Sequence, residues 1–265
     1  MLALLFDPLF RLPLITGVLI ALSLPLIGAL LMLREEWLAA FGLAHLAAAS
    51  ALLGLAIGIP AVLGGLLGAV AGGAFKFLTQ ARGNLVYGFM VLLGWSALGL
   101  IAANTTLGAA LGHALIEGQL YFAGLLEVAA AALLAVITLI MLPRLMPALI
   151  RARLFPTHEL ANRLPRHRWH LRFDLLAALA MAIGTATIGL MGAFALVLVP
   201  AWIAFRVAPG WRWTLALCAL CGCGGYLLAY LLALRLDQPF GPLLVAVLLG
   251  FAALAAAVPC ARRPL

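Results

Sequence analysis

The chain is a series of long apolar runs separated by short polar segments. Most of the runs contain no charged residue: 12–33, 37–75, 83–116, 175–205, 213–234 and 238–261. A further run, 118–143, is interrupted only by Glu127. An α-helix rises about 1.5 Å per residue, so about 20 apolar residues cross the roughly 30 Å hydrocarbon core of a bilayer. Each run is therefore predicted to hold one or two membrane-spanning helices.

Two segments are too long for a single crossing. The run 37–75 is expected to break into two helices at Gly58-Ile59-Pro60, because glycine and proline interrupt helices. Segment 173–206 would be about 50 Å long as one helix, whereas two full spans need about 40 residues. The glycines between Gly184 and Gly192 indicate a helix that turns and returns as a shorter helix over 193–205.

The predicted fold class is therefore an all-α, polytopic membrane helix bundle of eight to nine membrane segments, including the broken or short helical hairpin at 173–206. Composition supports this prediction. Of the 265 residues, 67% are hydrophobic and 9% charged, with a mean hydropathy of +1.22. Soluble domains have about 45–50% apolar and about 25% charged residues. A soluble fold is excluded, and we expect residues 1–265 to form one transmembrane domain.

Basic residues fall at alternate loops along the chain. They are Arg34, then Lys76 and Arg82, then Arg144 through Arg172, then Arg206 and Arg212, then Arg262 and Arg263, whereas the intervening loops hold few basic residues, with Arg235 as the one exception. Because cytoplasmic loops carry the excess of lysine and arginine, this alternation predicts an outside N-terminus, a cytoplasmic C-terminus and an odd number of crossings. The formal net charge of +8 is then explained by orientation in a lipid bilayer, and no nucleic-acid partner is expected.

Polar residues in or beside the apolar runs are candidate functional groups, because a charge at the bilayer centre costs about 2.5–3.5 kcal/mol on insertion scales. His45 lies near the cytoplasmic start of the second predicted helix, with Ser50 a little over one turn beyond. His113 and Glu117 have i, i+4 spacing at an outer loop, and Asp237 lies in the last outer loop. Imidazole and carboxylate groups suit divalent transition metals. The alternative for His45 is a hydrogen bond to a neighbouring helix.

Two further features are weaker candidates. Glu127 lies in the fifth predicted helix and is an additional oxygen ligand for a metal. Cys218 and Cys221 share a helix face, and thiolates suit copper(I) or zinc, although structural packing is the favoured interpretation. All four cysteines lie in or beside late apolar stretches, which argues against a disulfide framework: Cys218, Cys221, Cys223 and Cys260.

The longest predicted cytoplasmic segment is 143–172. Thr157 is a good N-cap, and a short helix over 158–164 would be bounded by Pro156 and Pro165. The many arginines and this capped helix indicate a docking surface for a cytoplasmic partner. Anionic lipid head groups would explain the arginines but not the helix.

No nucleotide-binding or hydrolase motif accompanies these features. The patterns GxxxxGK[ST], GxSxG and HExxH are absent from the sequence. The chain is therefore not predicted to be an enzyme, and any ATP hydrolysis that drives transport would take place on another chain.

Over about residues 14–258 the sequence resembles the membrane permeases of the zinc/manganese/iron ABC importers. The matching segments, in chain order, are Pro25–Gly28, Arg34–Trp37, Phe41–His45, Leu93–Gly99, Gln119–Gly124, Thr157–Ala161, Ile188–Arg206 and Asp237–Pro242. The last two are the most specific, because they occur in order and at the expected helix ends. One position departs from the family: the acidic residue four positions before His45 is Phe41 here.

The resemblance implies an assembly and a path for a metal ion. It implies a transmembrane permease domain that forms a homodimer, with two cytoplasmic ATP-binding subunits and an extracytoplasmic metal-binding protein, in a bacterial cytoplasmic (inner) membrane. The implied substrate is a divalent transition metal ion, with zinc as the first candidate and manganese or iron next. No permanently bound cofactor is expected. The segment that resembles the coupling helix on the ATPase contains Thr157, His158, Glu159, Leu160, Ala161 and Arg163.

By alternating access, metal would enter near His113, Glu117 and Asp237, pass His45 and Ser50, and leave on the cytoplasmic side.

Two alternatives come from other classes of protein. An ATP-independent channel or secondary transporter should show inverted repeats with matching broken helices, and only one broken element is apparent here. A membrane anchor or assembly protein would have no substrate at all.

Overall fold

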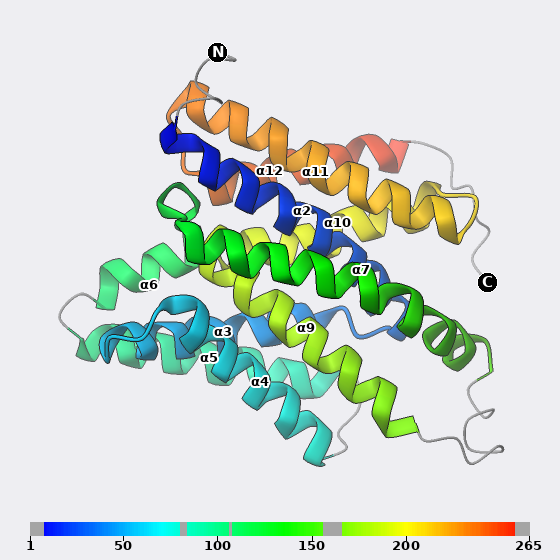
Figure 1. Cartoon of the computed structure of the whole chain (residues 1–265), viewed down its shortest axis with the longest axis horizontal. Coiled ribbons are helices and arrows are strands. Elements are labelled where there is room, and N and C mark those ends of the chain that lie inside the picture. The colour runs from blue at the N-terminus through cyan, green and yellow to red at the C-terminus, as the bar shows by residue number, and fades with distance from the viewer. Residues whose placement is uncertain (1–7, 80–83, 106–107, 156–165, 258–265) are drawn as a thin grey trace.

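A computed structural model describes residues 8–79, 84–105, 108–155 and 166–257. In this part of the chain all regular elements are helical, which confirms the all-α prediction (Figure 1). They are α2 (Pro8–Arg34), α3 (Leu38–Ala56), α4 (Ala61–Thr79), α5 (Asn84–Asn104), α6 (Gly108–Glu117), η1 (Leu120–Phe122), α7 (Leu125–Leu154), α9 (Arg166–Ile188), α10 (Leu190–Val207), α11 (Trp211–Leu236) and α12 (Phe240–Ala257).

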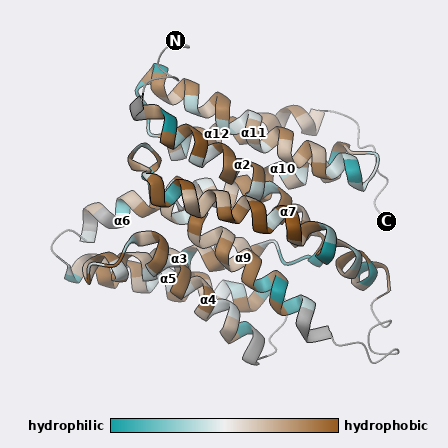
Figure 2. Ribbon diagram, in the orientation of Figure 1, coloured by the Kyte–Doolittle hydropathy of each residue, from teal (hydrophilic) through white to brown (hydrophobic). Residues whose placement is uncertain are grey.

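Eight of these helices are long and apolar enough to cross a membrane: α2, α3, α5, α7, α9, α10, α11 and α12. The helix α4 is a shorter apolar helix over 61–76, and counting it gives nine membrane segments within the described residues. The prediction of eight to nine is confirmed. Figure 2 shows hydrophobic colour along the helices and hydrophilic colour mainly near their ends.

The predicted break at Gly58-Ile59-Pro60 is present, since α3 ends at Ala56 and α4 begins at Ala61. The hairpin within 173–206 differs in detail. Its return helix α10 begins at Leu190 rather than at 193, so both arms are long enough to span the membrane. One residue makes the turn, because Gly189 adopts a φ of +94° that side chains other than glycine rarely tolerate.

The helices form two groups around α2 and α9. One group contains α3, α4 and α5, and the other contains α10, α11 and α12; α2 contacts α7, α9, α10 and α11 (Figure 1). About three quarters of the most apolar windows of α2 and α9 are buried (72% and 78%), against 22% for α5 and for α7. α2 and α9 are therefore the interior of the bundle, whereas α5 and α7 present apolar side chains outward, as suits lipid.

The loops divide between the two ends of the bundle as the alternation of basic residues predicts. Arg34, Lys76, Arg153 and Arg206 lie at one end, where they contact α2, α9 and the last turn of α12. We call this the arginine-rich end. At the other end α6 contacts the α9–α10 turn and the start of α12, through Gly118 against Gly189 and Glu117 against Gly241. α2 begins at that opposite end, and α12 ends at the arginine-rich end.

Small residues allow α2 to approach its neighbours closely. A Cβ on Gly28 would come within 1.9 Å of the Val197 carbonyl oxygen on α10. Pro25 leaves the Ala21 carbonyl without its helical donor, and Gly222 of α11 lies directly against both residues. In lipid there is no hydrophobic drive between helices, so such backbone contacts provide much of the association energy.

We predict that Gly28→Ala destabilises the protein by about 1–3 kcal/mol or more, because its methyl group would overlap a backbone atom that has no rotamer to change. Gly224→Ala is the matched control, since nothing lies within 4 Å of a Cβ at that position of α11. It should leave the protein unchanged or up to about 1 kcal/mol more stable, from helix propensity. Thermal unfolding in detergent measures both, and equal stability of the two variants would contradict the α2–α10 packing.

Candidate functional site

His45 is buried in the α3–α5 contact, with 6% of its surface exposed. A Cβ on Gly94 of α5 would lie 2.5 Å from the His45 carbonyl carbon, so only glycine allows α5 to pass this close. The His45 Nδ1 donates a hydrogen bond to the Phe41 carbonyl oxygen at 2.9 Å. Because a carbonyl only accepts, Nδ1 carries the proton in the neutral ring, and Nε2 carries the lone pair that can accept.

Phe41 contacts His45 from the preceding turn of α3. The two ring centroids are 4.4 Å apart at 81°, and Phe41 also packs on Phe194 of α10 at 4.8 Å. An aromatic ring therefore lies beside the imidazole, at the position where the family pattern has an acid. In the part of the chain that the structure describes, no group of three or more His, Cys, Asp or Glu side chains is placed to hold a metal ion.

Ser50 lies on a different face of α3 from His45. Its hydroxyl donates to the Leu46 carbonyl oxygen at 2.7 Å, and it packs against Gly68 of α4. The two residues are five positions apart, which turns their side chains about 140° apart on a helix of 3.6 residues per turn. His45 therefore faces α5 and Ser50 faces α4, and the structure does not bring these two predicted site residues together.

The remaining predicted metal ligands lie at the end opposite the arginine-rich end. His113 and Glu117 are on α6, with Nδ1 and Oε1 4.0 Å apart and side chains 78% and 52% exposed. Asp237 is the exposed C-cap of α11, with a φ of +51°. Gly241, four residues beyond Asp237, packs on the Glu117 backbone. The three residues thus share one end of the bundle, where α6 touches the segment between α11 and α12.

Glu127 and the described cysteines have structural contacts instead. The Gly124 backbone N–H donates to the Glu127 carboxylate at 2.8 Å, which caps the first turn of α7. Cys218 is buried, with its Sγ 3.8 Å from the Pro200 carbonyl oxygen, and Cys218, Cys221 and Cys223 are free thiols. The predicted coupling residues Thr157, His158, Glu159, Leu160, Ala161 and Arg163 lie outside the described residues.

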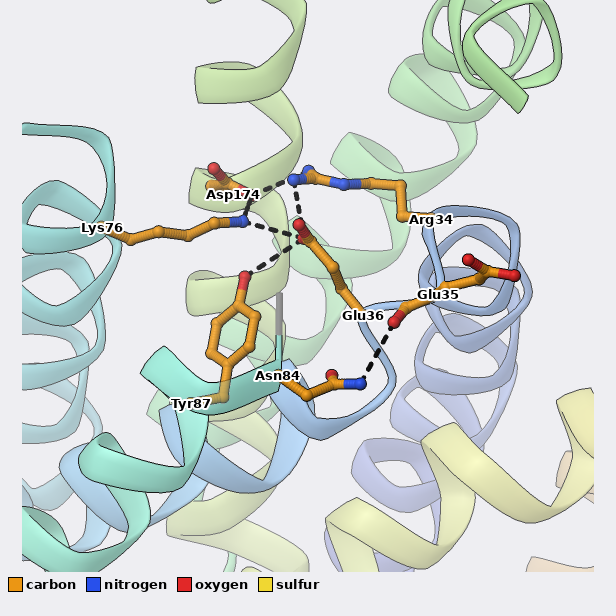
Figure 3. Close-up of polar contacts among 7 residues, drawn as sticks. All are labelled: Arg34, Glu35, Glu36, Lys76, Asn84, Tyr87 and Asp174. Atoms are coloured by element: carbon orange, nitrogen blue, oxygen red, sulfur yellow. Dashed lines mark hydrogen bonds and ion pairs between the residues drawn. The ribbon is translucent and has the colours of Figure 1, made fainter. Parts of the chain in front are cut away.

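A buried cluster of four charged side chains was not predicted from the sequence (Figure 3). Arg34 pairs with Glu36 at 2.6 Å and with Asp174 at 2.8 Å. Lys76 pairs with the same two carboxylates, at 2.8 Å and 3.3 Å. The four side chains are only 7–12% exposed. The Tyr87 hydroxyl of α5 donates to Glu36 at 3.2 Å. We call these four charged residues and Tyr87 the ion-pair cluster.

The end of α2 directs Glu36 into this cluster. The Glu35 and Glu36 backbone N–H groups bond to the Met32 and Leu31 carbonyls, both at 3.1 Å, and Glu35 has a φ of +57°. This is the Schellman pattern, in which a left-handed residue reverses the chain after a helix. Glycine is the usual residue there, so a glutamate costs about 1–2 kcal/mol. The reversed chain brings Glu36 back beside Arg34.

Each charge in the cluster faces an opposite charge or an aromatic ring. Arg34 lies 4.7 Å from the Phe173 ring centroid, and Lys76 lies 5.0 Å from that of Tyr87. Burial alone would raise the pKa of Glu36, but Arg34 and Lys76 more than offset this and hold it below the ordinary value. Glu36 is therefore ionised at neutral pH.

The sequence contained one signal for the cluster. Asp174 is the acidic residue that precedes the apolar run 175–205 and follows an arginine-rich segment. Arg34 was interpreted as a marker of orientation and as part of the family-like segment Arg34–Trp37, and Lys76 as a marker of orientation. The structure shows that both are also ion-pair partners.

These features define a polytopic helical membrane protein with a buried imidazole between helices and charges paired at one end. The chain belongs to the ABC 3 transport family, whose model matches residues 7–258. It is a permease subunit of the metal-type ABC importers, as the sequence resemblance implied. No curated protein matches the sequence.

Two solved structures share the fold. The structure of PsaBC from Streptococcus pneumoniae in complex with Fab is similar with a TM-score of 0.83 and 14% identity, covering 98% of this chain and 96% of the other. An inward-facing structure of a transporter described as metal-chelate type has a TM-score of 0.75 and 15% identity, covering 92% and 84%. At these identities the likeness shows the fold alone.

We predict that Glu36→Gln lowers stability by about 3–5 kcal/mol, because two buried cations would then share one carboxylate. Glu35→Gln is the control: its ion pair with Arg153 is 67% and 50% exposed, and such surface pairs contribute at most about 1 kcal/mol. Thermal unfolding in detergent at neutral pH measures both variants. Similar losses of stability in Glu36→Gln and Glu35→Gln would show that the buried ion pairs contribute no more to stability than the exposed pair does.

The stability of the wild type and that of Glu36→Gln should depend differently on acid pH. The pKa of Glu36 is lower in the folded protein than its ordinary value of 4.5, so its contribution is fully present above that value. It is lost as the pH falls through the folded pKa. The wild type should therefore lose more stability than Glu36→Gln on acidification below 4.5.

Proposed function

We propose that this chain is the translocation subunit of an ATP-driven importer of divalent transition metal ions, with zinc as the first candidate and manganese or iron next. The family match over nearly the whole chain carries the proposal. The buried His45, with its Nε2 lone pair directed away from the Phe41 carbonyl bond, supports a metal substrate, because neutral imidazole binds zinc and iron alike.

The proposed assembly has two copies of this chain, two cytoplasmic ATP-binding subunits and an extracytoplasmic metal-binding protein. By the positive-inside rule, the arginine-rich end faces the cytoplasm of a bacterial cell and the N-terminus lies outside the inner membrane. The end with His113, Glu117 and Asp237 then receives the metal, since their exposed carboxylates and imidazole can accept a hydrated cation.

The described residues favour brief rather than tight binding on the path. Phe41 stands where the family pattern has a carboxylate, so His45 supplies one ligand without an acidic partner on the same helix face. Conduction requires sites loose enough to release the ion. ATP-driven motion, transmitted through Thr157–Ala161 and Arg163, would open His45 first to the outer end and then to the arginine-rich end.

We expect His45→Ala to lower zinc or manganese uptake by the reconstituted complex at least about tenfold, the scale of losing about 1.4 kcal/mol of metal binding. His170→Ala is the matched control, because it removes a histidine that stacks on Trp169 near the arginine-rich end. Phe41→Asp, which would place a carboxylate beside the imidazole, should strengthen metal binding to the purified permease. Unchanged uptake in His45→Ala would exclude His45 as a ligand.

For the coupling segment, the charge reversal Glu159→Arg with Arg163→Glu should abolish uptake while the protein still inserts into the membrane. The reason is that an exposed docking helix recognises its partner by charge and shape. Co-purification with the ATP-binding subunit reports docking directly. Wild-type levels of the co-purified ATP-binding subunit would contradict the assignment of 157–163 as the segment on which that subunit docks.

A further inference from the structure

A pocket of about 340 Å³ opens at the arginine-rich end, between the last turns of α2, α7 and α10. Met32 and Leu33 of α2 and Phe205 of α10 give it an apolar lining, and two guanidinium groups and one carboxylate complete its wall. These side chains are separate from the ion-pair cluster and from the predicted metal ligands. A ligand in this pocket would therefore be distinct from the transported metal.

The charged groups give the pocket a net positive charge, since Arg153 and Arg206 line it together with one carboxylate, that of Glu35. Arg206 is held in place by the end of α12. Its Nε and Nη2 donate to the Ala255 and Ala256 carbonyl oxygens at 3.1 and 3.0 Å. Arginine binds phosphate well because its planar set of N–H donors matches the phosphate oxygens. The pocket thus suits an anionic ligand that contains a phosphate group.

Arg153 can exchange its present partner for such a ligand. Its Nη1 lies 2.6 Å from the Glu35 Oε1, but the two side chains are 50% and 67% exposed. An ion pair in contact with water contributes at most about 1 kcal/mol, whereas a phosphate between two guanidinium groups accepts charge-assisted hydrogen bonds. Glu35 and the phosphate would therefore compete for Arg153.

The pocket lies at the level of the lipid head groups. Trp202, 39% exposed, and Arg206 lie in the last two turns of the membrane-spanning α10, with the guanidinium carbon 5.8 Å from the indole ring centroid. Tryptophan is enriched at membrane–water interfaces. Leu154 and Phe155, directly after Arg153, are each 60% exposed, which suits contact with acyl chains.

An anionic phospholipid matches both parts of the pocket. Its phosphate would lie between the two guanidinium groups, and its glycerol and first acyl carbons would lie against the apolar lining. A free phosphate ion would gain nothing from that lining. Basic pockets between membrane helices on the cytoplasmic side are a recurring kind of site for anionic lipid head groups.

We propose that the pocket between α2, α7 and α10 binds the head group of one anionic phospholipid of the cytoplasmic leaflet, with Arg153 and Arg206 as the phosphate ligands. The choice of leaflet rests on the orientation in the proposed function, whereas the binding itself depends only on the fold. Because the lipid joins the ends of three helices and binds only the folded chain, it also stabilises the protein.

Native mass spectrometry of the full-length chain in detergent counts the bound lipids during titration with phosphatidylglycerol or phosphatidylcholine of the same acyl chains. One phosphatidylglycerol should bind at least about tenfold more tightly than phosphatidylcholine, because only the former has a net negative charge. Arg153→Gln and Arg206→Gln should each weaken phosphatidylglycerol binding at least about tenfold, since each removes a charge-assisted contact. If Arg206→Gln does not fold, Arg153→Gln decides, because its exposed ion pair contributes little to stability.

Two matched variants separate the pocket from the general positive charge of this end. Arg144→Gln removes an exposed arginine of α7 that does not line the pocket, and it should bind phosphatidylglycerol as the wild type does. Glu35→Gln removes the competing carboxylate and should bind phosphatidylglycerol at least about threefold more tightly, which a merely loosened fold would not do. Equal effects of Arg144→Gln and Arg153→Gln, or no gain in Glu35→Gln, overturn the proposal.

Two further measurements identify the occupant. Inorganic phosphate at millimolar concentration should leave phosphatidylglycerol bound, and displacement of the lipid by phosphate overturns the lipid assignment. The complex with the ATP-binding subunit should retain the lipid. Its release on assembly would assign the pocket to that subunit and overturn the proposal as well.

These measurements need neither metal nor ATP, so their outcome is separate from that of the proposed function. Absence of zinc, manganese and iron uptake by the complete complex would overturn the proposed function and leave the lipid site as it is. Equal binding of phosphatidylglycerol and phosphatidylcholine would overturn the lipid site alone.

Discussion

The cost of placing a charge or an unpaired polar group in lipid shapes this protein throughout. Backbone groups in hydrocarbon must bond within their own segment, so the spanning elements are helices. Most of the described arginines lie near helix ends. Where Arg34, Glu36, Lys76 and Asp174 do lie inside the bundle, each faces an opposite charge within 3.3 Å. Among the described residues, the ion-pair cluster is therefore the place where the bundle interior holds full charges, and it holds them only as a neutral set.

Close backbone packing is the second consequence of the lipid environment. Helices in lipid associate through surface fit rather than through exclusion of water. Gly28 brings α2 against α10, and Gly94 brings α5 against His45. The same kind of contact that holds the bundle together thus also encloses the imidazole. Because glycine contacts of this kind leave no space between the helices, any change of conformation must move whole helices relative to one another.

Much of the fold could be predicted because it depends on local sums of hydropathy. The break at Gly58-Ile59-Pro60 and the two ends of the bundle follow from residues near each feature in the chain. The start of α10 was misplaced at 193, because several glycines lie close together and only the backbone shows that Gly189 makes the turn. The i, i+4 alignment of His113 and Glu117 on a helix was also correct, since α6 covers both.

The sequence by itself determined the class of fold, the membrane spans and the family. It also determined that successive loops alternate between the two ends of the bundle. Each of these depends on neighbouring residues or on ordered motifs. Only the tertiary structure decided which polar groups meet. Asp174 reaches Arg34 across 140 positions and Lys76 across 98, while His45 and Ser50, five positions apart, face different helices. Partners of buried charges are chosen by helix packing, and packing brings together residues that no local pattern relates.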